Sequence, residues 1–344
     1  MNEREYILSL ARSRPAGPPA DVLMAMGDDC AVVRKCGSTV TLLSMDTMVE
    51  GVHFDRAFHP PELLGRKVMS VNVSDIAAMG GSPTLVLFSA GLPPGFDADW
   101  VQAFNQGLLD ACAFYNCSLI GGDTVASPGG YSFTITILGE MEDKDVLYRR
   151  GALAGDTIYM SGRSGLAAGG LALLSAGFSA DDTRFSELFV RHLNPEARLQ
   201  LGRRLAASGL VHAMMDSSDG LATDLAHICT ASQLGARIFS QRLHIPPALQ
   251  EAAELCKADP LDWILRGGED FELIFTAPPQ AEAALFNLVQ DCAVPIQAIG
   301  LMDEDDEAGL RLVLEQAADE GAGGRSEISL SYQGYDHFLQ PRKD

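Results

Sequence analysis

The chain has 344 residues and a mass of 36.7 kDa, which predicts two domains of about 150 residues each, because single hydrophobic cores seldom grow larger. Hydrophobic residues make up 47% of the sequence, which excludes a disordered chain. No apolar run reaches the ~18 residues of a membrane helix, and we expect no membrane partner. The formal net charge of -21 disfavours nucleic-acid binding, which needs a basic surface.

The N-terminal half alternates strand-like and helix-like segments. Residues 39–45 and 131–138 are rich in β-branched and aromatic side chains, as strands are. Residues 62–79 predict a helix that ends at Gly80-Gly81. Within it, Asn72 and Asp75 are three residues apart among apolar neighbours, so we expect the pair to face inward or into a cleft. An exposed polar pair is the alternative.

A second helix is predicted after the cap residue Asp97, where apolar residues recur at helical spacing as far as Cys112. The polar segment 149–155 then suggests a boundary between domains at residues 1–150 and 151–344. Beyond it we expect a strand at residues 157–160.

The glycine-rich segment 162–170 follows that strand and opens a predicted helix. Such a turn can present backbone NH groups to phosphate, but glycines that allow close helix packing are an equal alternative. Asn194-Pro195 predicts the start of a helix over residues 196–207. Residues 212–215 then read as a strand and residues 221–231 as a helix.

Acidic residues recur in short glycine-, serine- or threonine-rich segments at the ends of apolar stretches. The segments are Gly27-Asp28-Asp29, Ser44-Met45-Asp46-Thr47, Asn72-Val73-Ser74-Asp75, Gly121-Gly122-Asp123-Thr124, Asp216-Ser217-Ser218-Asp219-Gly220 and Gly267-Gly268-Glu269-Asp270. Carboxylates beside apolar strands need compensation, since an unpaired buried charge costs several kcal/mol. Mg²⁺ supplies it by bridging carboxylates to phosphates. Helix capping explains one aspartate of 216–219 more easily than both.

Nothing in the first 19 residues fits a signal peptide. The seven cysteines show no Cys-x-x-Cys spacing, which favours free thiols in a reducing compartment. We therefore expect a cytoplasmic protein.

Taken in order, these segments resemble the thiamine-monophosphate kinases, within the superfamily of ATP-dependent enzymes similar to aminoimidazole ribonucleotide synthetase. The His53 segment and the closing Gly334-Tyr335-Asp336-His337-Phe338 point to the thiamine members. The resemblance implies an α/β (α+β) fold, with an N-terminal metal- and ATP-binding domain that pairs across a homodimer. A C-terminal α+β domain would close over nucleotide and substrate.

The resemblance also implies a reaction, in which ATP donates its γ-phosphoryl group to thiamine monophosphate with the help of several Mg²⁺ ions. Because phosphoryl transfer needs alignment and charge neutralisation, we expect no protein nucleophile. Carried over by position, the implied metal residues are Asp29, Ser44, Met45, Asp46, Asp75, Asp123, Asp216 and Asp219. The implied ATP contacts are Gly122, Asp123, Arg149 and Ser218, and the substrate contacts are His53, Glu269 and Tyr335.

At two positions the family's residue roles do not carry over directly to this sequence. Met45 stands where the family usually has threonine, and neighbouring Arg150 makes the choice of Arg149 ambiguous. Rival functions are a sister enzyme of the aminoimidazole ribonucleotide synthetase or selenophosphate synthetase type, and a non-catalytic nucleotide or thiamine-phosphate sensor. A sensor would have lost metal aspartates, which this chain keeps.

Overall fold

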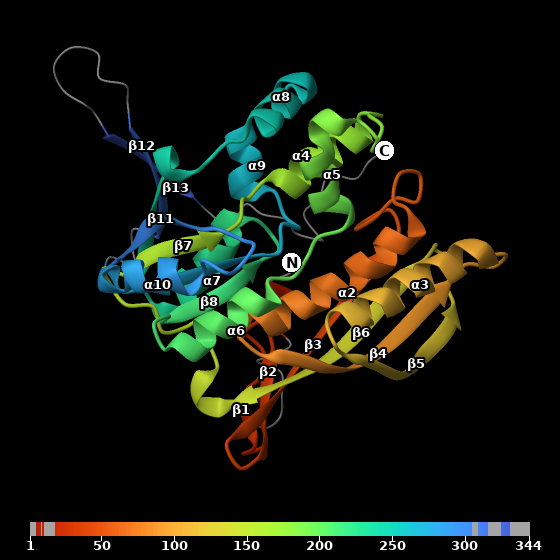
Figure 1. The fold of residues 1–344 in the computed structure, drawn as a ribbon, viewed down its shortest axis with the longest axis horizontal. Helices are drawn as coiled ribbons and strands as arrows, with labels where there is room; N and C mark the ends of the chain where they lie inside the picture. Colours follow the sequence, from red (N-terminus) through yellow and green to blue (C-terminus); the bar gives the residue numbers. More distant parts are fainter. Residues whose placement is uncertain (1–4, 8, 10–17, 305–308, 316–324, 331–344) are drawn as a thin grey trace.

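The computed structural model describes residues 5–7, 9, 18–304, 309–315 and 325–330. In this part of the chain two β-sheets lie side by side, each with its own helices, and the long helix α2 (Pro61–Ala78) runs close to both (Figure 1). The predicted mixed α and β architecture is confirmed.

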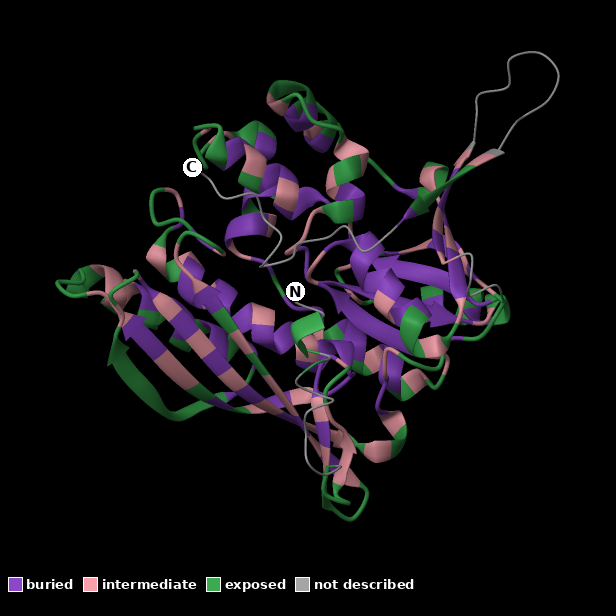
Figure 2. Cartoon of the chain, turned by 180° about the vertical axis from the view of Figure 1, so that it is seen from behind, coloured by how far each residue is buried: buried purple, intermediate pink, exposed green. Residues whose placement is uncertain are grey.

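The first sheet holds six strands within the described residues, in the order β1-β2-β3-β6-β4-β5. Only the β4–β5 pair among these is parallel. Burial alternates along β6, so one face packs inward and the other does not. Edge strand β5 is exposed along its whole length (Figure 2). The strands are β1 (Val22–Met24), β2 (Ala31–Cys36), β3 (Thr39–Val49), β4 (Ser82–Leu92), β5 (Ser118–Ala126) and β6 (Ser132–Glu142).

Helices α2 and α3 (Ala98–Phe114) cover the buried face of this sheet (Figure 1). The predicted cap is confirmed, since the Asp97 carboxylate accepts hydrogen bonds from the backbone nitrogens of Asp99 and Trp100. Phe104 of α3 stacks on Phe133 of β6 with ring centroids 4.0 Å apart. Aromatic contacts therefore join helix and sheet into one core.

The second sheet holds seven strands within the described residues, in the order β13-β12-β9-β11-β7-β10-β8. They are β7 (Thr157–Ser161), β8 (Ala213–Ser217), β9 (Gly235–Phe239), β10 (Glu272–Ala277), β11 (Ile296–Asp303), β12 (Leu310–Glu315) and β13 (Arg325–Leu330). The accompanying helices are α4 (Leu166–Ser175), α5 (Ser186–Leu193), α6 (Leu199–Ser208), α7 (Leu221–Ser232), α8 (Pro247–Cys256), α9 (Pro260–Arg266) and α10 (Glu282–Leu288).

The two halves share an apolar contact around the end of α2. Ala78 lies in one buried cluster with Leu201 and Leu205 of α6 and with Met214 of β8. Because α2 packs on the first sheet and also reaches β8, polar side chains on this helix can touch both halves.

The predicted start of the helix after Asn194-Pro195 is wrong, because α6 begins at Leu199. The Asn194 side chain does not cap it; its Oδ1 accepts a hydrogen bond from Arg66 Nε. The backbone nitrogen of Ala197 donates to the Tyr115 hydroxyl at 3.0 Å. These tertiary contacts hold residues 195–198 outside the helix.

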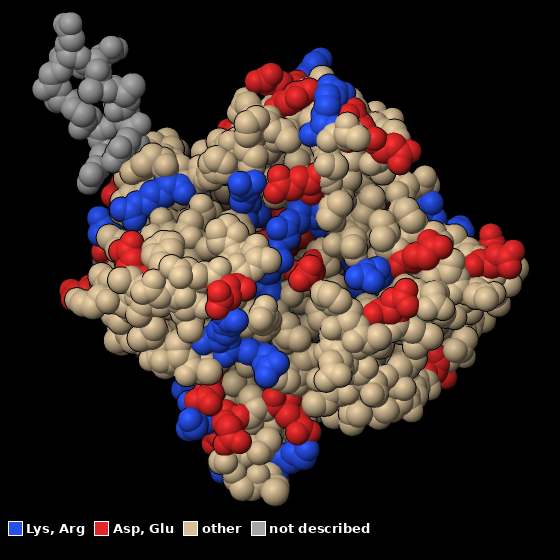
Figure 3. All heavy atoms as spheres, viewed as in Figure 1, with Lys and Arg blue, Asp and Glu red and all other residues tan. Residues whose placement is uncertain are grey.

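On the face drawn in Figure 3, basic and acidic side chains are interleaved and form no continuous basic stripe. None of the helices in the described residues has the length and apolar character needed to cross a membrane. The cysteines are free thiols, as expected.

Candidate metal and phosphate site

Three aspartates from distant parts of the chain meet where the two sheets adjoin. Asp29 precedes β2, Asp75 lies in α2 and Asp216 lies in β8. One carboxylate oxygen of each lies within 4.8 Å of the others. Within the described ranges this is the one group of three or more candidate ligands at such spacing. The structure thus gathers three of the predicted metal residues.

Polar groups of α2 and β3 hold these carboxylates in place. Ser74 Oγ donates to Asp216 Oδ2 at 2.5 Å, which ties α2 to the second sheet. Ser44 Oγ donates to Asp75 Oδ2, which ties α2 to the first. The predicted inward orientation of Asn72 is confirmed, because it is buried and its Oδ1 accepts from the Asp46 backbone nitrogen at 3.0 Å.

Burial and mutual repulsion hold protons on this cluster. Burial and the neighbouring carboxylates raise the pKa of Asp75 well above its ordinary value. Burial, followed by the charge of Asp29, raises the pKa of Asp216 to about 8. Burial also raises the pKa of Asp46, although a hydrogen bond with Asp75 opposes the shift. The cluster is therefore incompletely ionised near neutral pH unless cations compensate it.

Arg149 is the basic residue that faces the cluster. Its Nε and Nη2 donate to Asp29 Oδ1 at 3.0 and 2.5 Å, and its backbone nitrogen donates to the Asp28 carboxylate at 3.2 Å. The neighbouring Arg150 instead lies over the Tyr148 ring, 4.9 Å from its centroid. Of the two arginines, the structure therefore turns Arg149 toward the acidic residues.

The second oxygen of Asp29 is left without a partner. Asp29 Oδ2 is buried and accepts no hydrogen bond from any described residue. A buried carboxylate oxygen is normally satisfied. An orphaned oxygen beside two further carboxylates, in an all-oxygen environment with Ser44, fits a hard divalent cation such as Mg²⁺.

Met45 lies on the opposite side of β3 from its neighbours. Successive side chains of a strand point to opposite faces, and the Met45 residue is 64% exposed whereas Ser44 and Asp46 are half-buried. Only the backbone of Met45 can therefore share the site with Ser44 and Asp46 in this chain.

Gly122 and Asp123 lie away from the cluster, on the exposed edge strand β5. The strand registers place Asp46 opposite Ile135, Ile135 opposite Phe88 and Phe88 opposite Gly122. Three strand spacings separate Asp46 from Gly122, about 14 Å along the sheet. Gly122 itself packs tightly, since a Cβ there would lie 1.7 Å from the Phe88 carbonyl oxygen. An open, shallow hollow in the surface here is lined by Phe88, Leu119, Gly121, Gly122, Asp123 and Thr124.

The segment after β8 is held by Asp224, a residue that the sequence analysis did not single out. Asp224 is buried in α7, and its carboxylate accepts from Ser217 Oγ at 3.1 Å and from the Asp219 backbone nitrogen at 3.4 Å. An aspartate one turn into a helix that follows a Ser-rich segment is the signal that could have identified it.

Glu269 lies beside the same segment, with its backbone nitrogen donating to the Ser218 carbonyl oxygen at 2.8 Å. Its carboxylate forms an ion pair with Lys67 of α2, a residue that the sequence analysis also missed. His53 lies in the turn after β3, where its Nδ1 accepts from the Val49 backbone nitrogen at 3.0 Å. Tyr335 lies outside the described residues.

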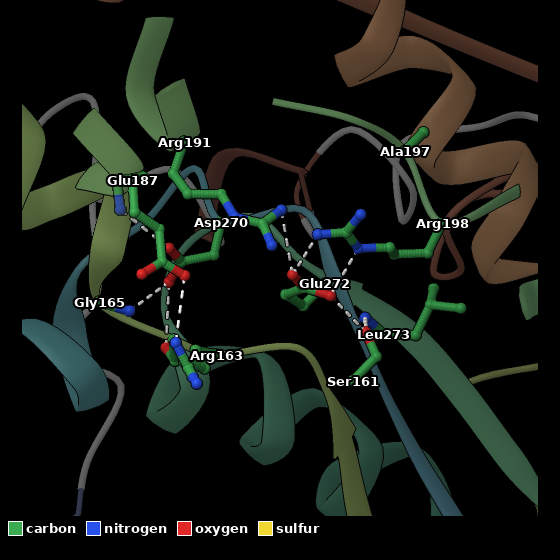
Figure 4. A network of polar contacts seen from close by, with 12 residues as sticks. Ser161, Arg163, Gly165, Glu187, Arg191, Ala197, Arg198, Asp270, Glu272 and Leu273 are labelled. Atoms are coloured by element: carbon green, nitrogen blue, oxygen red, sulfur yellow. Dashed lines mark hydrogen bonds and ion pairs between the residues drawn. The ribbon is translucent and has the colours of Figure 1, made fainter. Parts of the chain in front are cut away.

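The glycine-rich turn before α4 is occupied by a side chain of the protein itself (Figure 4). The Asp270 carboxylate accepts from the backbone nitrogens of Gly165 at 2.6 Å and Ala167 at 3.1 Å, and from Ser164 Oγ. A Cβ at Gly170 would lie 2.3 Å from the Leu188 carbonyl oxygen. Of the two alternatives for this segment, the structure favours close helix packing over phosphate binding.

Beside this turn, two arginines surround the fully buried Glu272 (Figure 4). Arg198 donates to both carboxylate oxygens at 2.7 and 2.5 Å, and Arg191 lies 3.4 Å away. Because Arg198 lies just before α6, this paired buried charge fixes the chain between α5 and α6.

Comparisons with known proteins cover nearly the whole chain. The family models AIR synthase related protein, N-terminal domain, and AIR synthase related protein, C-terminal domain, match residues 27–141 and 154–313. Thiamine-monophosphate kinase of Escherichia coli (strain K12) is 37% identical over 93% of this chain and 94% of its own length. The Bacillus subtilis (strain 168) protein of the same name is 33% identical over the same shares. A solved structure of AaThiL complexed with AMPPCP and TMP is 31% identical, with a TM-score of 0.82 over 98% of this chain and 97% of that one.

Proposed function

The chain belongs to the thiamine-monophosphate kinase family, and we propose that it transfers the γ-phosphoryl group of ATP to thiamine monophosphate, giving thiamine diphosphate and ADP. The AaThiL structure, complexed with AMPPCP and TMP, supports the proposal, because both ligands are bound there to the same fold. The observation in this chain that supports the proposal most strongly is the largely buried Asp29–Asp75–Asp216 cluster with its orphaned Asp29 oxygen.

The chain's own residues would bind and align the reactants. Asp29, Asp75 and Asp216, with Ser44 and Asp46, offer the oxygens that would hold Mg²⁺. When bound, the cations neutralise the negative charge on the two phosphates. Arg149, which now pairs with Asp29, has a planar guanidinium suited to phosphate oxygens. The substrate phosphate is mostly dianionic at neutral pH, since its second pKa is about 6, so no general base is needed.

The remaining site residues complete the proposal. Asp219 and the backbone of Met45 would add to the metal residues, and Gly122, Asp123 and Ser218 would contact the nucleotide. His53, Glu269 and Tyr335 would contact the substrate. The domain of residues 1–150 would supply the metal and ATP contacts, and the domain of residues 151–344 would close over both ligands.

A homodimer would explain the position of Asp123. Within one chain, Asp123 is on an exposed edge strand, too far from Asp46 to share a metal ion with it. Leu119, Ile120 and Val125 of the same strand are exposed as well. Burying such an edge against a second copy would cover apolar surface and unpaired backbone groups together. We therefore propose that Asp123 of one subunit faces the cluster of the other.

The experiment is incubation of the purified protein with ATP, Mg²⁺ and thiamine monophosphate, followed by chromatography for thiamine diphosphate and ADP. Free thiamine and aminoimidazole ribonucleotide precursors serve as parallel substrates. We expect equal amounts of thiamine diphosphate and ADP, and no product when EDTA is present. Turnover of another substrate would indicate a sister enzyme, and ligand binding without ADP would indicate a sensor.

A further inference from the structure

Lys67 is a fully buried lysine in the middle of α2. Its side chain is 0% exposed, and Nζ lies 3.0 Å from Glu269 Oε2. Lys67 comes from the first domain and Glu269 from the second, so the ion pair crosses the boundary between them. Lysine is almost never fully buried unless it is paired, and a buried pair is seldom formed for stability alone.

Two uncharged histidine side chains, His192 and His59, lie near this ion pair. His192 Nδ1 lies 3.4 Å from the same oxygen, Glu269 Oε2. Burial and the Lys67 ammonium lower the pKa of His192, and they lower the pKa of His59 to about 2. Both rings are therefore neutral near pH 7. Burial opposes ionisation of Glu269, but the Lys67 ammonium outweighs it and holds the pKa of Glu269 well below its ordinary value.

The backbone of Glu269 is held in a strained conformation. Its φ of 68° lies in the left-handed region, which non-glycine residues rarely adopt. Strain of this kind persists only where surrounding contacts over-determine the conformation. Here the contacts are the ion pair with Lys67 at the side chain and the hydrogen bond to the Ser218 carbonyl at the backbone.

Part of the Glu269 side chain nevertheless remains accessible. Lys67 and His192 both contact Oε2, and 26% of the side chain is exposed. Lys67 and His192 thus fix the carboxylate through Oε2, and the partly exposed side chain belongs to a residue whose backbone bonds to the 216–219 segment. Neighbouring side chains thus hold the carboxylate in a fixed orientation, as is typical of residues in a binding site.

We propose that Lys67 is a positioning residue for substrate recognition, which holds the Glu269 carboxylate ionised and oriented toward a cationic heteroaromatic ligand. The inference rests on the proposed function, in which Glu269 contacts thiamine monophosphate. A fixed carboxylate can accept a hydrogen bond from the amino group of the aminopyrimidine or face the positive thiazolium ring. Lys67 itself touches no ligand in this arrangement.

The test compares Lys67→Met with the wild type in steady-state kinase assays, varying thiamine monophosphate and ATP separately. We expect the KM for thiamine monophosphate to rise roughly tenfold or more, as for loss of a hydrogen bond to a charged group. The KM for ATP should stay within about twofold, because Lys67 acts only on the substrate side. The matched control is Arg66→Met, the preceding residue, which reaches Asn194 instead of Glu269 and should leave both KM values unchanged.

A double-mutant cycle keeps the test decisive if Lys67→Met folds poorly with an unpaired Glu269. Lys67→Met/Glu269→Gln leaves neither charge buried without its partner, and Glu269→Gln keeps an amide oxygen that can accept a hydrogen bond from the Lys67 ammonium. Equal KM values for thiamine monophosphate in these two variants support the proposal. The proposal would be overturned if the KM for thiamine monophosphate were higher in the double variant than in Glu269→Gln. It would also be overturned if Lys67→Met raised the KM values for thiamine monophosphate and ATP equally. If the wild type itself does not phosphorylate thiamine monophosphate, the proposed function fails first and the inference falls with it.

Discussion

Asp216→Asn should stabilise the metal-free protein, although Asp216 is buried and hydrogen-bonded. The variant removes one charge from the Asp29–Asp75–Asp216 cluster. It keeps an acceptor for Ser74 Oγ, which now donates to Asp216 Oδ2 at 2.5 Å, because the amide oxygen of asparagine can replace that carboxylate oxygen.

The size of the effect can be worked from the repulsion between carboxylates and from the protonation of Asp216, which reflects both that repulsion and burial. Two charged carboxylate oxygens that lie within 4.8 Å of one another repel by at least about 3.5 kcal/mol at an effective dielectric constant of about 20. Burial, followed by the charge of Asp29, raises the pKa of Asp216 from the ordinary 3.8 to about 8, so Asp216 is mostly protonated in the folded protein at pH 7. At pH 7 that proton costs about 4 kcal/mol, at roughly 1.4 kcal/mol per pKa unit. Since the asparagine side chain of the variant needs no proton, we expect a gain of about 2–4 kcal/mol in unfolding free energy.

The assay is thermal or denaturant unfolding at pH 7, in EDTA and in excess Mg²⁺. In EDTA the variant should melt several degrees above the wild type, and Mg²⁺ should stabilise the wild type much more than the variant. Asp262→Asn, which removes an exposed carboxylate paired with Arg266 on α9, serves as the control and should change little. The electrostatic account would be refuted if the variant melted below the wild type in EDTA. It would also be refuted if Mg²⁺ raised the melting temperature of the variant as much as that of the wild type.

Three further predictions follow from the same geometry. In EDTA the wild type should lose stability as the pH rises from about 4 to 8. The folded pKa values of Asp28 and Asp216, about 7 and 8, exceed the ordinary 3.8, so the folded state retains protons that the unfolded chain releases. Melting curves at several pH values check this, and a melting temperature that does not change with pH would contradict it. Arg149→Lys should raise the KM for ATP about tenfold, because the planar guanidinium is lost. The control Arg150→Lys alters a residue that lies over the Tyr148 ring and should leave this KM unchanged. Equal effects of the two substitutions would count against Arg149 as the ATP contact. Met45→Thr should change kcat less than about twofold, because this residue is 64% exposed and its side chain points away from the site. A large change would mean that the side chain reaches the site.

The sequence predicted the acidic cluster but not the contacts that organise it. The segments that contain Asp29, Asp75 and Asp216 stood out because carboxylates beside apolar segments need compensation, and the family resemblance then pointed to these three residues. Lys67 was missed because, in a helix, a lysine usually extends its ammonium group to solvent, and its partner Glu269 is 202 residues away. That separation is invisible to any local pattern.

The order of the strands in the sheet also could not be predicted from the sequence. Asp123 carries the same local signature as Asp46, yet β5 lies at the sheet edge, three strands from β3. Local patterns also gave α6 an early start, because Asn194-Pro195 is a good helix start in isolation. Contacts of Asn194 with Arg66 and of Ala197 with Tyr115 override that preference.

Direct phosphoryl transfer from ATP to thiamine monophosphate is the central claim, and a single-turnover experiment with γ-³²P-labelled ATP tests it most directly. The enzyme, in excess, is mixed with labelled ATP, Mg²⁺ and thiamine monophosphate, then quenched, and the label is followed in both product and protein. We predict that the label passes into thiamine diphosphate at the rate of ADP formation and never accumulates on the protein. Labelled protein that forms before the product, or ADP released with no labelled thiamine diphosphate, would contradict the account.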